Sequence, residues 1–266
     1  METIICKLLN KDGVVLESAE GSKALYHAFQ HTYQEGDRIE IRVPEGEALY
    51  HIQIDDVLGL ETVWLSRREW SYEIPFGGER ERFSPLTFSG DSHLISVKPA
   101  DGYEVMGYRN LAKNRLDQRR ESGCYPHVTA NAETPKACFY ALNAIDGCRA
   151  NTSHGWWLHT AWGTARHPEP ELRLDFGREV AVDRVVLYER ADFPHDNWWK
   201  HVTLAFSNGS TVTANLEKTA EGQVISFPKK KISWLELREL SLADDPSPFP
   251  ALSQLEVYGT EILEDL

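Results

Sequence analysis

Short runs in which apolar and polar residues alternate recur along this chain, and they constrain its fold more than any other feature. A β-strand points successive side chains to opposite faces, so such a run predicts a strand with one buried face. Ile39, Ile41 and Val43 alternate with polar residues, and residues 50–54 repeat the pattern after a turn. Turn-forming residues separate the runs, which is typical of an antiparallel sandwich or barrel.

The start of the chain predicts a hairpin, because Asp12-Gly13 lies between two apolar runs. The apolar residues from Ala24 to Phe29 then have helical spacing, with Ser22 as an N-cap, and predict a helix that ends near Gly36. Further strands are predicted near residues 62–65, 70–74 and 94–97.

A polar, charged stretch interrupts the alternation at residues 114–120, where few apolar positions remain to be buried. A helix is left open there, and we interpret the region as a connection packed across both domains. The length of 266 residues suits two domains better than one. The predicted domains are therefore residues 1–98 and 125–266, joined by residues 99–124.

Alternation resumes in the second half, where Leu172, Leu174 and Phe176 predict a buried face. Asn208-Gly209 marks a tight hairpin after another alternating run. Other strands are expected near residues 182–187, 211–215, 223–227, 234–240 and 255–258, and a short helix near residues 137–144. The predicted fold class is all-β, with two antiparallel β-sandwich domains.

Charge limits the partners of the chain. Its formal net charge is −13, which disfavours nucleic acids and anionic membranes because both would be repelled. The N-terminal residues lack a basic segment followed by a long apolar one, and no apolar run is long enough to span a bilayer. We therefore expect a cytoplasmic protein. The four cysteines match no zinc or redox spacing, which favours free buried thiols, with a Cys138–Cys148 pair left open.

Polar and aromatic residues gather in three segments between the predicted strands of the second half, at residues 143–152, 156–162 and 190–200. Two adjacent tryptophan pairs, 156–157 and 198–199, lie in them. Neighbouring side chains of an extended chain point to opposite sides, so one tryptophan of each pair is expected in the core. Trp162 and Trp234 are expected in the core as well.

These segments favour a small polar ligand such as a sugar. A tryptophan ring can stack on a pyranose, and carboxylate and guanidinium groups can bind its hydroxyls. The alternative is that the charged residues form a salt-bridge network that merely fixes the loop. The candidate ligand-binding residues are His154, Trp157, His159, Arg190, Asp192, His195, Asp196 and Trp198.

An ordered set of motifs resembles the galactose-binding-like domains, which include the discoidin (coagulation-factor type C) domains and family 32 carbohydrate-binding modules. The set comprises Asp146-Gly147, Thr160-Ala161-Trp162, the run 172–177, Ser207-Asn208-Gly209 and the closing run 255–259, and it covers roughly residues 125–260. The segment 125–131 is similar to a bacterial branch described as carbohydrate-binding or of unknown function. The resemblance implies a jelly-roll sandwich whose loops at one end bind ligands.

The resemblance also implies a structural Ca²⁺ ion beside the Asp-Gly loop. Carried over to this chain, its ligands would be Asp146, Asn151, Thr152 and Glu256, completed by backbone carbonyls. Ca²⁺ takes six to eight oxygen ligands, which these residue types can supply. A cysteine follows Asp146-Gly147 where an acidic or amide residue would strengthen such a site.

Three functions follow from these patterns. We expect non-catalytic carbohydrate binding through the loops of the second sandwich. One alternative is a metal-dependent enzyme that acts on a sugar with loop histidines, although no HExxH, nucleophile-elbow or phosphate-loop motif is present and no catalytic residue is assigned. The second alternative is a protein-interaction or assembly module, which leaves a homo-oligomer open.

Overall fold

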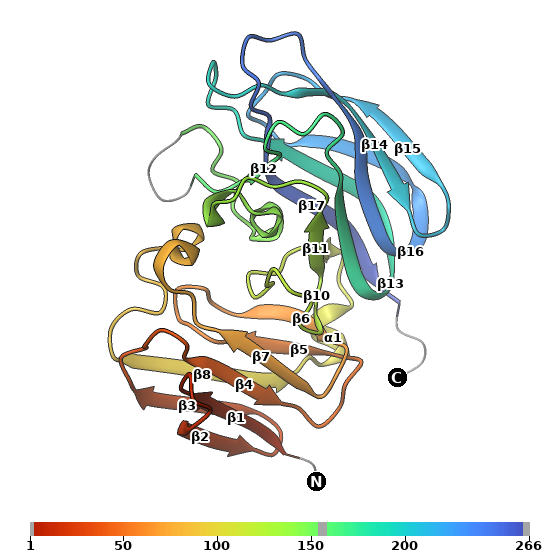
Figure 1. The fold of residues 1–266 in the computed structure, drawn as a ribbon. Coiled ribbons are helices and arrows are strands. Elements are labelled where there is room, and N and C mark those ends of the chain that lie inside the picture. Colours follow the sequence, from red (N-terminus) through yellow and green to blue (C-terminus); the bar gives the residue numbers. More distant parts are fainter. Residues whose placement is uncertain (1–2, 154–158, 263–266) are drawn as a thin grey trace.

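Two layers of antiparallel strands form the N-terminal part of the protein, as seen in a computed structural model that describes residues 3–153 and 159–262. The first layer has the order β2-β1-β4-β7 and the second the order β10-β6-β5-β8-β3 (Figure 1). The strands are β1 (Ile4–Leu9), β2 (Val15–Gly21), β3 (Leu25–Gln30), β4 (Arg38–Arg42), β5 (Ala48–Gln53), β6 (Glu61–Leu65), β7 (Glu69–Glu73), β8 (Ser92–Pro99) and β10 (Cys124–Tyr125). The predicted first sandwich is thus an all-β unit that also takes in a strand from beyond residue 98.

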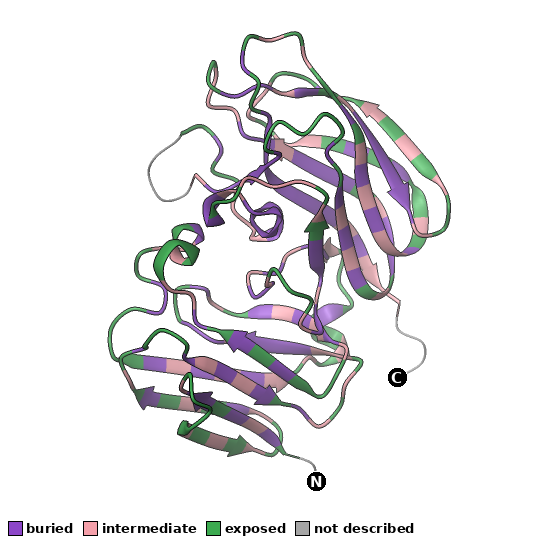
Figure 2. Cartoon of the chain, viewed as in Figure 1, coloured by how far each residue is buried: buried purple, intermediate pink, exposed green. Residues whose placement is uncertain are grey.

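The alternation of the sequence appears as stripes of buried and exposed residues along these strands (Figure 2). Ile39, Ile41 and Val43 are each at most 1% exposed, as predicted. The helix predicted from Ser22 is wrong, because β3 occupies that segment. Residues four apart share a face in a strand as well as in a helix, so the spacing of Leu25 and Phe29 did not discriminate between the two.

Long bent strands build the second sandwich, in an eight-stranded sheet with the path β12-β17-β13-β16-β14-β15, to which β11 and β9 add at β13 and β17. The strands are β9 (Arg109–Asn110), β11 (His127–Ala130), β12 (Trp162–Gly163), β13 (Leu172–Glu189), β14 (Trp199–Phe206), β15 (Thr211–Asn215), β16 (Gln223–Leu242) and β17 (Ala251–Glu261). The register between β13 and β16 breaks twice, between Asp175 and Val180 and between Val182 and Arg184. Such irregularities bend strands, so one strand can serve both layers of the sandwich.

The core of this sandwich contains Trp162, Leu172 and Phe176, all fully buried. Trp234 is only half-buried, which contradicts the expectation that it lies in the core; the Arg173 guanidinium lies 4.0 Å from its ring centroid. The helix predicted near residues 137–144 consists of two 3₁₀ turns, η2 (Ala137–Phe139) and η3 (Ala141–Ile145).

The connecting segment runs between the two sandwiches and is bonded to both. Its strand β9 pairs with β17, and β10 pairs with β6. It contains the short helix α1 (Gly102–Val105), but residues 114–120 are not helical. Arg115 donates hydrogen bonds to the Leu58 carbonyl at 3.1 Å and to the Asp146 carbonyl at 2.7 Å, one in each half of the protein.

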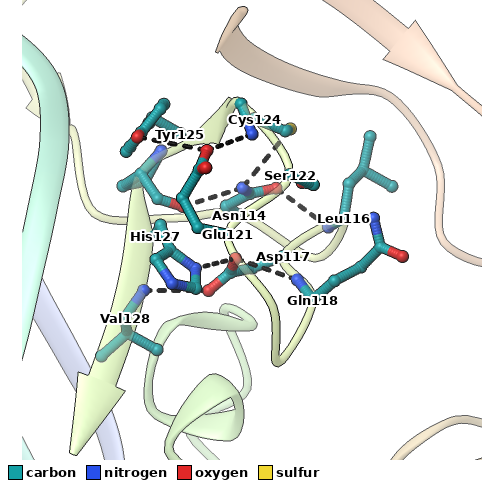
Figure 3. A network of polar contacts seen from close by, with 12 residues as sticks. Asn114, Leu116, Asp117, Gln118, Glu121, Ser122, Cys124, Tyr125, His127 and Val128 are labelled. Atoms are coloured by element: carbon teal, nitrogen blue, oxygen red, sulfur yellow. Dashed lines mark hydrogen bonds and ion pairs between the residues drawn. The ribbon is translucent and has the colours of Figure 1, made fainter. Parts of the chain in front are cut away.

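Polar side chains of this segment form a network of contacts with one another and with the start of β11, as Figure 3 shows. Asn114 and Asp117 are 0% and 1% exposed. The Asp117 carboxylate accepts hydrogen bonds from the Val128 backbone N–H at 3.0 Å and from the His127 ring at 2.7 Å, and it thereby ties the connection to β11. A buried carboxylate is costly unless it is paired, and these bonds offset that cost.

The helices that the structure describes are all too short to span a bilayer.

Candidate functional site

A pocket of about 440 Å³ opens at one end of the second sandwich, where β12 lies, β13 ends and β17 begins. Its size is within the range of small-molecule sites. The described residues that line it are Thr134, Phe139, Gly163, Thr164, Ala165, Arg166, Arg190, His195, Phe249, Pro250 and Ala251. Two of the predicted ligand-binding residues, Arg190 and His195, are among them.

Arg190 follows the last residue of β13 and is only 4% exposed. Its Nε and Nη2 atoms donate to the two carboxylate oxygens of Asp196, at 3.0 and 2.9 Å. Asp196 is fully buried and also accepts the Asp192 backbone N–H, at 3.0 Å, while the His195 ring lies 3.1 Å from it. Asp196 therefore holds the loop and orients Arg190, as the network alternative anticipated, and it does not line the pocket.

The loop after β16 is bonded to the loop that carries His195. The buried Asn197 side chain donates to the Ser247 carbonyl at 2.7 Å, and its backbone N–H donates to the Phe249 carbonyl at 3.1 Å. The Ser247 hydroxyl donates in turn to the His195 carbonyl. These bonds fix Phe249 at the pocket although its side chain is 38% exposed.

Each of the two phenylalanine rings that line the pocket has an arginine side chain over it. The Arg190 guanidinium lies 5.0 Å from the Phe139 ring centroid, and the Arg166 guanidinium lies 4.4 Å from that of Phe249. His195 also stacks on Phe249, with ring centroids 5.6 Å apart. Cation–π contacts of this kind hold long side chains in a defined orientation.

Arg166 is presented by a strained turn. Ala165 and Arg166 have φ angles of 50° and 61°, in the left-handed region that costs a non-glycine residue about 1–2 kcal/mol. Strain of this kind persists where the surrounding structure imposes it, and it is common at ligand sites.

Two buried polar atoms at the pocket have no hydrogen-bond partner among the described residues: Nη1 of Arg190 and Oγ1 of Thr164. Thr164 is only 2% exposed. A buried donor without an acceptor costs about 1–3 kcal/mol, so a ligand or a water molecule that completes these bonds gains that energy.

Beside Arg190, the buried Glu189 carboxyl faces the sandwich interior. It is 1% exposed and accepts hydrogen bonds from the Trp199 backbone N–H and the Gln223 amide. Burial raises the pKa of Glu189 to about 8, because the charged form loses its hydration. This carboxyl is therefore protonated at neutral pH.

The other predicted ligand-binding residues have different positions. His154 and Trp157 lie outside the described residues. His159 is half-buried and its ring makes an edge contact with Phe139, with centroids 6.1 Å apart, but it is not among the residues that line the pocket. Asp192 is half-buried in the loop of Asp196, and its carbonyl accepts the Asp196 N–H. Trp198 is half-buried and Trp199 is 2% exposed, which confirms that one residue of this pair is in the core.

The four residues expected to bind Ca²⁺ do not fit such a site as they are placed. The Asp146 oxygens accept bonds from the Cys148 N–H at 2.7 Å and the Thr160 hydroxyl at 3.3 Å. Glu256 forms an ion pair with Arg149, with an N–O distance of 2.6 Å.

Asn151 donates its amide to the Glu189 and Ala220 carbonyls, and Thr152 is exposed. A guanidinium on the glutamate repels a second cation, so no role in this chain is assigned to calcium. Burial raises the pKa of Asp146 to about 6.

The histidine alternative gains no support from the described part of the chain, where no three histidine, cysteine or acidic side chains form a group that could hold a metal. Sequence reasoning missed Arg166, Thr164, Phe139 and Phe249 at the pocket. One signal was available for Phe249, which lies between two prolines in the segment between the last two predicted strands.

Comparison with solved structures gives matches to sugar-binding modules over about half of the chain. A chitosan-binding module of a chitosanase/glucanase from Paenibacillus sp. IK-5 is 23% identical, with a TM-score of 0.40, over 56% of this chain and 98% of the module. A fucose-binding module from Streptococcus pneumoniae is 16% identical, with a TM-score of 0.41, over 57% of this chain and 98% of the module. A family 32 carbohydrate-binding module from Clostridium perfringens, solved with galactose, is 16% identical, with a TM-score of 0.39, over 49% and 91%.

At these identities the likeness concerns the fold alone, and it assigns no ligand to this chain. No curated protein matches the sequence. The matched modules include one of family 32, the group of carbohydrate-binding modules that the motifs resemble. Residues 127–258 match the family model described as "Domain of unknown function (DUF7402)". This region contains every described residue that lines the pocket. It also contains the strands of the second sandwich, except β9 and the last residues of β17.

Proposed function

We propose that the second sandwich binds a carbohydrate in the pocket between Phe139, Arg190 and Phe249, and that it does so without catalysis. The observation that carries this proposal is the pair of buried, unpartnered polar atoms, Arg190 Nη1 and Thr164 Oγ1, at a pocket that also has apolar walls. Sugars offer both of the surfaces that such a site needs, because their hydroxyls complete hydrogen bonds and their C–H groups contact apolar walls.

The pocket is also prearranged for binding. Asp196 fixes Arg190, and Asn197 and Ser247 fix the loop of Phe249, so little side-chain entropy remains to be lost when a ligand enters. The residues that orient these groups are themselves buried and bonded. This rigidity supports a dedicated binding site over a flexible loop region.

Isothermal titration calorimetry with a panel of hexoses, hexosamines, uronic acids and sulfated hexoses tests the proposal. Thr164→Val keeps the shape of the side chain and removes only the unpartnered hydroxyl. We expect it to leave stability unchanged or higher and to weaken binding about three- to tenfold, the worth of one hydrogen bond. Tyr103→Ala, which removes an aromatic side chain that is 80% exposed in the connection, is the control for the loss of an aromatic ring and should leave binding unchanged.

Phe249→Ala is a second variant, expected to abolish detectable binding because an apolar wall is lost. If no sugar of the panel binds to the folded protein, the carbohydrate proposal is wrong. If binding occurs but neither variant alters it, the sugar binds elsewhere and the assignment of the pocket is wrong.

A further inference from the structure

We propose that the ligand of this pocket carries a negative charge, and that it is an acidic sugar with a carboxylate or sulfate on its ring. This inference rests on the proposed function and specifies the class of sugar. It arises from the charges around the pocket, which differ in sign from those of the chain as a whole.

The chain has a formal net charge of −13. The described residues that line the pocket nevertheless include two arginines and a histidine and no carboxylate. An acidic protein that concentrates cationic side chains at one pocket creates a local potential that attracts anions.

The nearest buried carboxylate does not cancel this charge. Asp196 is 0% exposed and forms a two-bond ion pair with Arg190, so it balances that one guanidinium. Arg190 keeps Nη1 without an acceptor in the described part of the chain. A carboxylate or sulfate oxygen is the stronger acceptor for such a group, because charge-assisted hydrogen bonds are roughly twice as strong as neutral ones.

Arg166 supplies the unbalanced charge. Its guanidinium lies over the Phe249 ring and forms no ion pair with a carboxylate of residues 3–153 or 159–262. The strained turn at Ala165 and Arg166 and the contact with Phe249 together hold this cation at the pocket. Arg166 and Arg190 therefore line the same pocket, one from its exposed rim and one from its buried wall.

Calorimetric titrations with matched pairs test the inference. Glucuronate and glucose differ only at C6, as do galacturonate and galactose, and a 6-sulfated galactose distinguishes sulfate from carboxylate. At about 20 mM salt we expect the preferred acid to bind at least about tenfold tighter than its neutral partner. We expect this preference to shrink at about 500 mM salt, because the rim charge is exposed and screened.

Arg166→Gln removes the charge and keeps most of the side chain. We expect it to lower the ratio of acidic to neutral affinity at least about threefold, because only Arg190 then remains to favour the anion. Arg42→Gln, which removes an arginine that is 60% exposed in the first sandwich, should preserve the ratio. A preference for sulfate over carboxylate, or the reverse, supports the inference and identifies the group.

Neutral hexoses that bind as tightly as their acids would overturn the inference and leave carbohydrate binding intact. An acid preference that is undiminished in Arg166→Gln would also overturn it, because the charge of this pocket would then not be its cause. Failure of every sugar, acidic or neutral, to bind the folded protein refutes the proposed function itself.

Discussion

Replacing Asp117 by alanine tests whether the connection between the sandwiches is held by its buried polar network. The carboxylate accepts the His127 ring N–H at 2.7 Å and the Val128 N–H at 3.0 Å, and all three residues are less than 10% exposed. A third acceptor bond, from the Gln118 N–H, is half-exposed and contributes little. Each buried bond to a charged group is worth about 1.5–3 kcal/mol, so Asp117→Ala should lower the free energy of unfolding by about 3–5 kcal/mol.

Urea unfolding followed by circular dichroism measures this loss. Asp183→Asn is the matched control, because that carboxylate accepts one exposed hydrogen bond from Tyr108, and its replacement should cost less than about 1 kcal/mol. A loss of less than about 1 kcal/mol for Asp117→Ala would refute the reasoning, since the network would then add nothing beyond an exposed pair.

The same variant has a second readout in the ionisation of His127. Burial alone would lower the pKa of His127, but the hydrogen bond and charge of Asp117 raise it above 6.5. A raised folded-state pKa means that the protonated histidine stabilises the fold below about pH 6.5, and this contribution is lost as the pH rises through the folded pKa. Asp117→Ala should therefore lower the pKa of His127 seen by NMR, and the stability difference from the wild type should shrink with rising pH.

Three further predictions concern other parts of the second sandwich. The pKa of Glu189 is raised from 4.5 to about 8, so its protonated form stabilises the fold at low pH, and this contribution is lost as the pH rises between those values. In the wild type the free energy of unfolding should therefore fall by about 4 kcal/mol from about pH 5 to pH 8, as measured by urea unfolding, and Glu189→Gln should remove this fall. The same pH dependence in the variant would contradict the burial argument. Ala165→Gly should raise the free energy of unfolding by up to about 1 kcal/mol, because glycine accepts the φ of 50° without strain, and a destabilised variant in thermal unfolding would show that the turn is not strained. EDTA and added Ca²⁺ should leave the Tm unchanged, because Arg149 occupies Glu256; a Ca²⁺-dependent rise in Tm would reinstate the calcium site.

The alternation of apolar and polar residues was enough to predict most strands, because it determines locally which face of a strand is buried. Leu172, Leu174 and Phe176 are all fully buried, as their spacing predicted. The segment from Leu25 to Phe29 failed because its apolar spacing fits a strand as well as a helix. His27 shares the inner face of β3 and stacks on Phe29, with centroids 5.0 Å apart, and such an inward histidine conceals the alternation.

The candidate site was only partly predictable, because it depends on which loops meet. Arg190 and His195 could be predicted from the sequence, because they are polar residues near the end of a predicted strand. Asp196 was predicted to touch the ligand, but its carboxylate faces Arg190 and is fully buried. Arg166 and Phe249 come from loops more than 80 positions apart, and no local pattern indicates that their side chains meet.

The connecting segment makes the second sandwich a poor candidate for modular exchange. A chain cut at residue 125 would lose the strand β9 that extends β17, and with it Leu111 and Ala112, which belong to the core of the second sandwich. It would also lose the Asp117 carboxylate, so the His127 ring and the Val128 backbone N–H would be left without their acceptor. An intact core therefore needs more of the chain than residues 127–258, the region that the family model matches, and transfer of that region alone into another protein would leave the core incomplete.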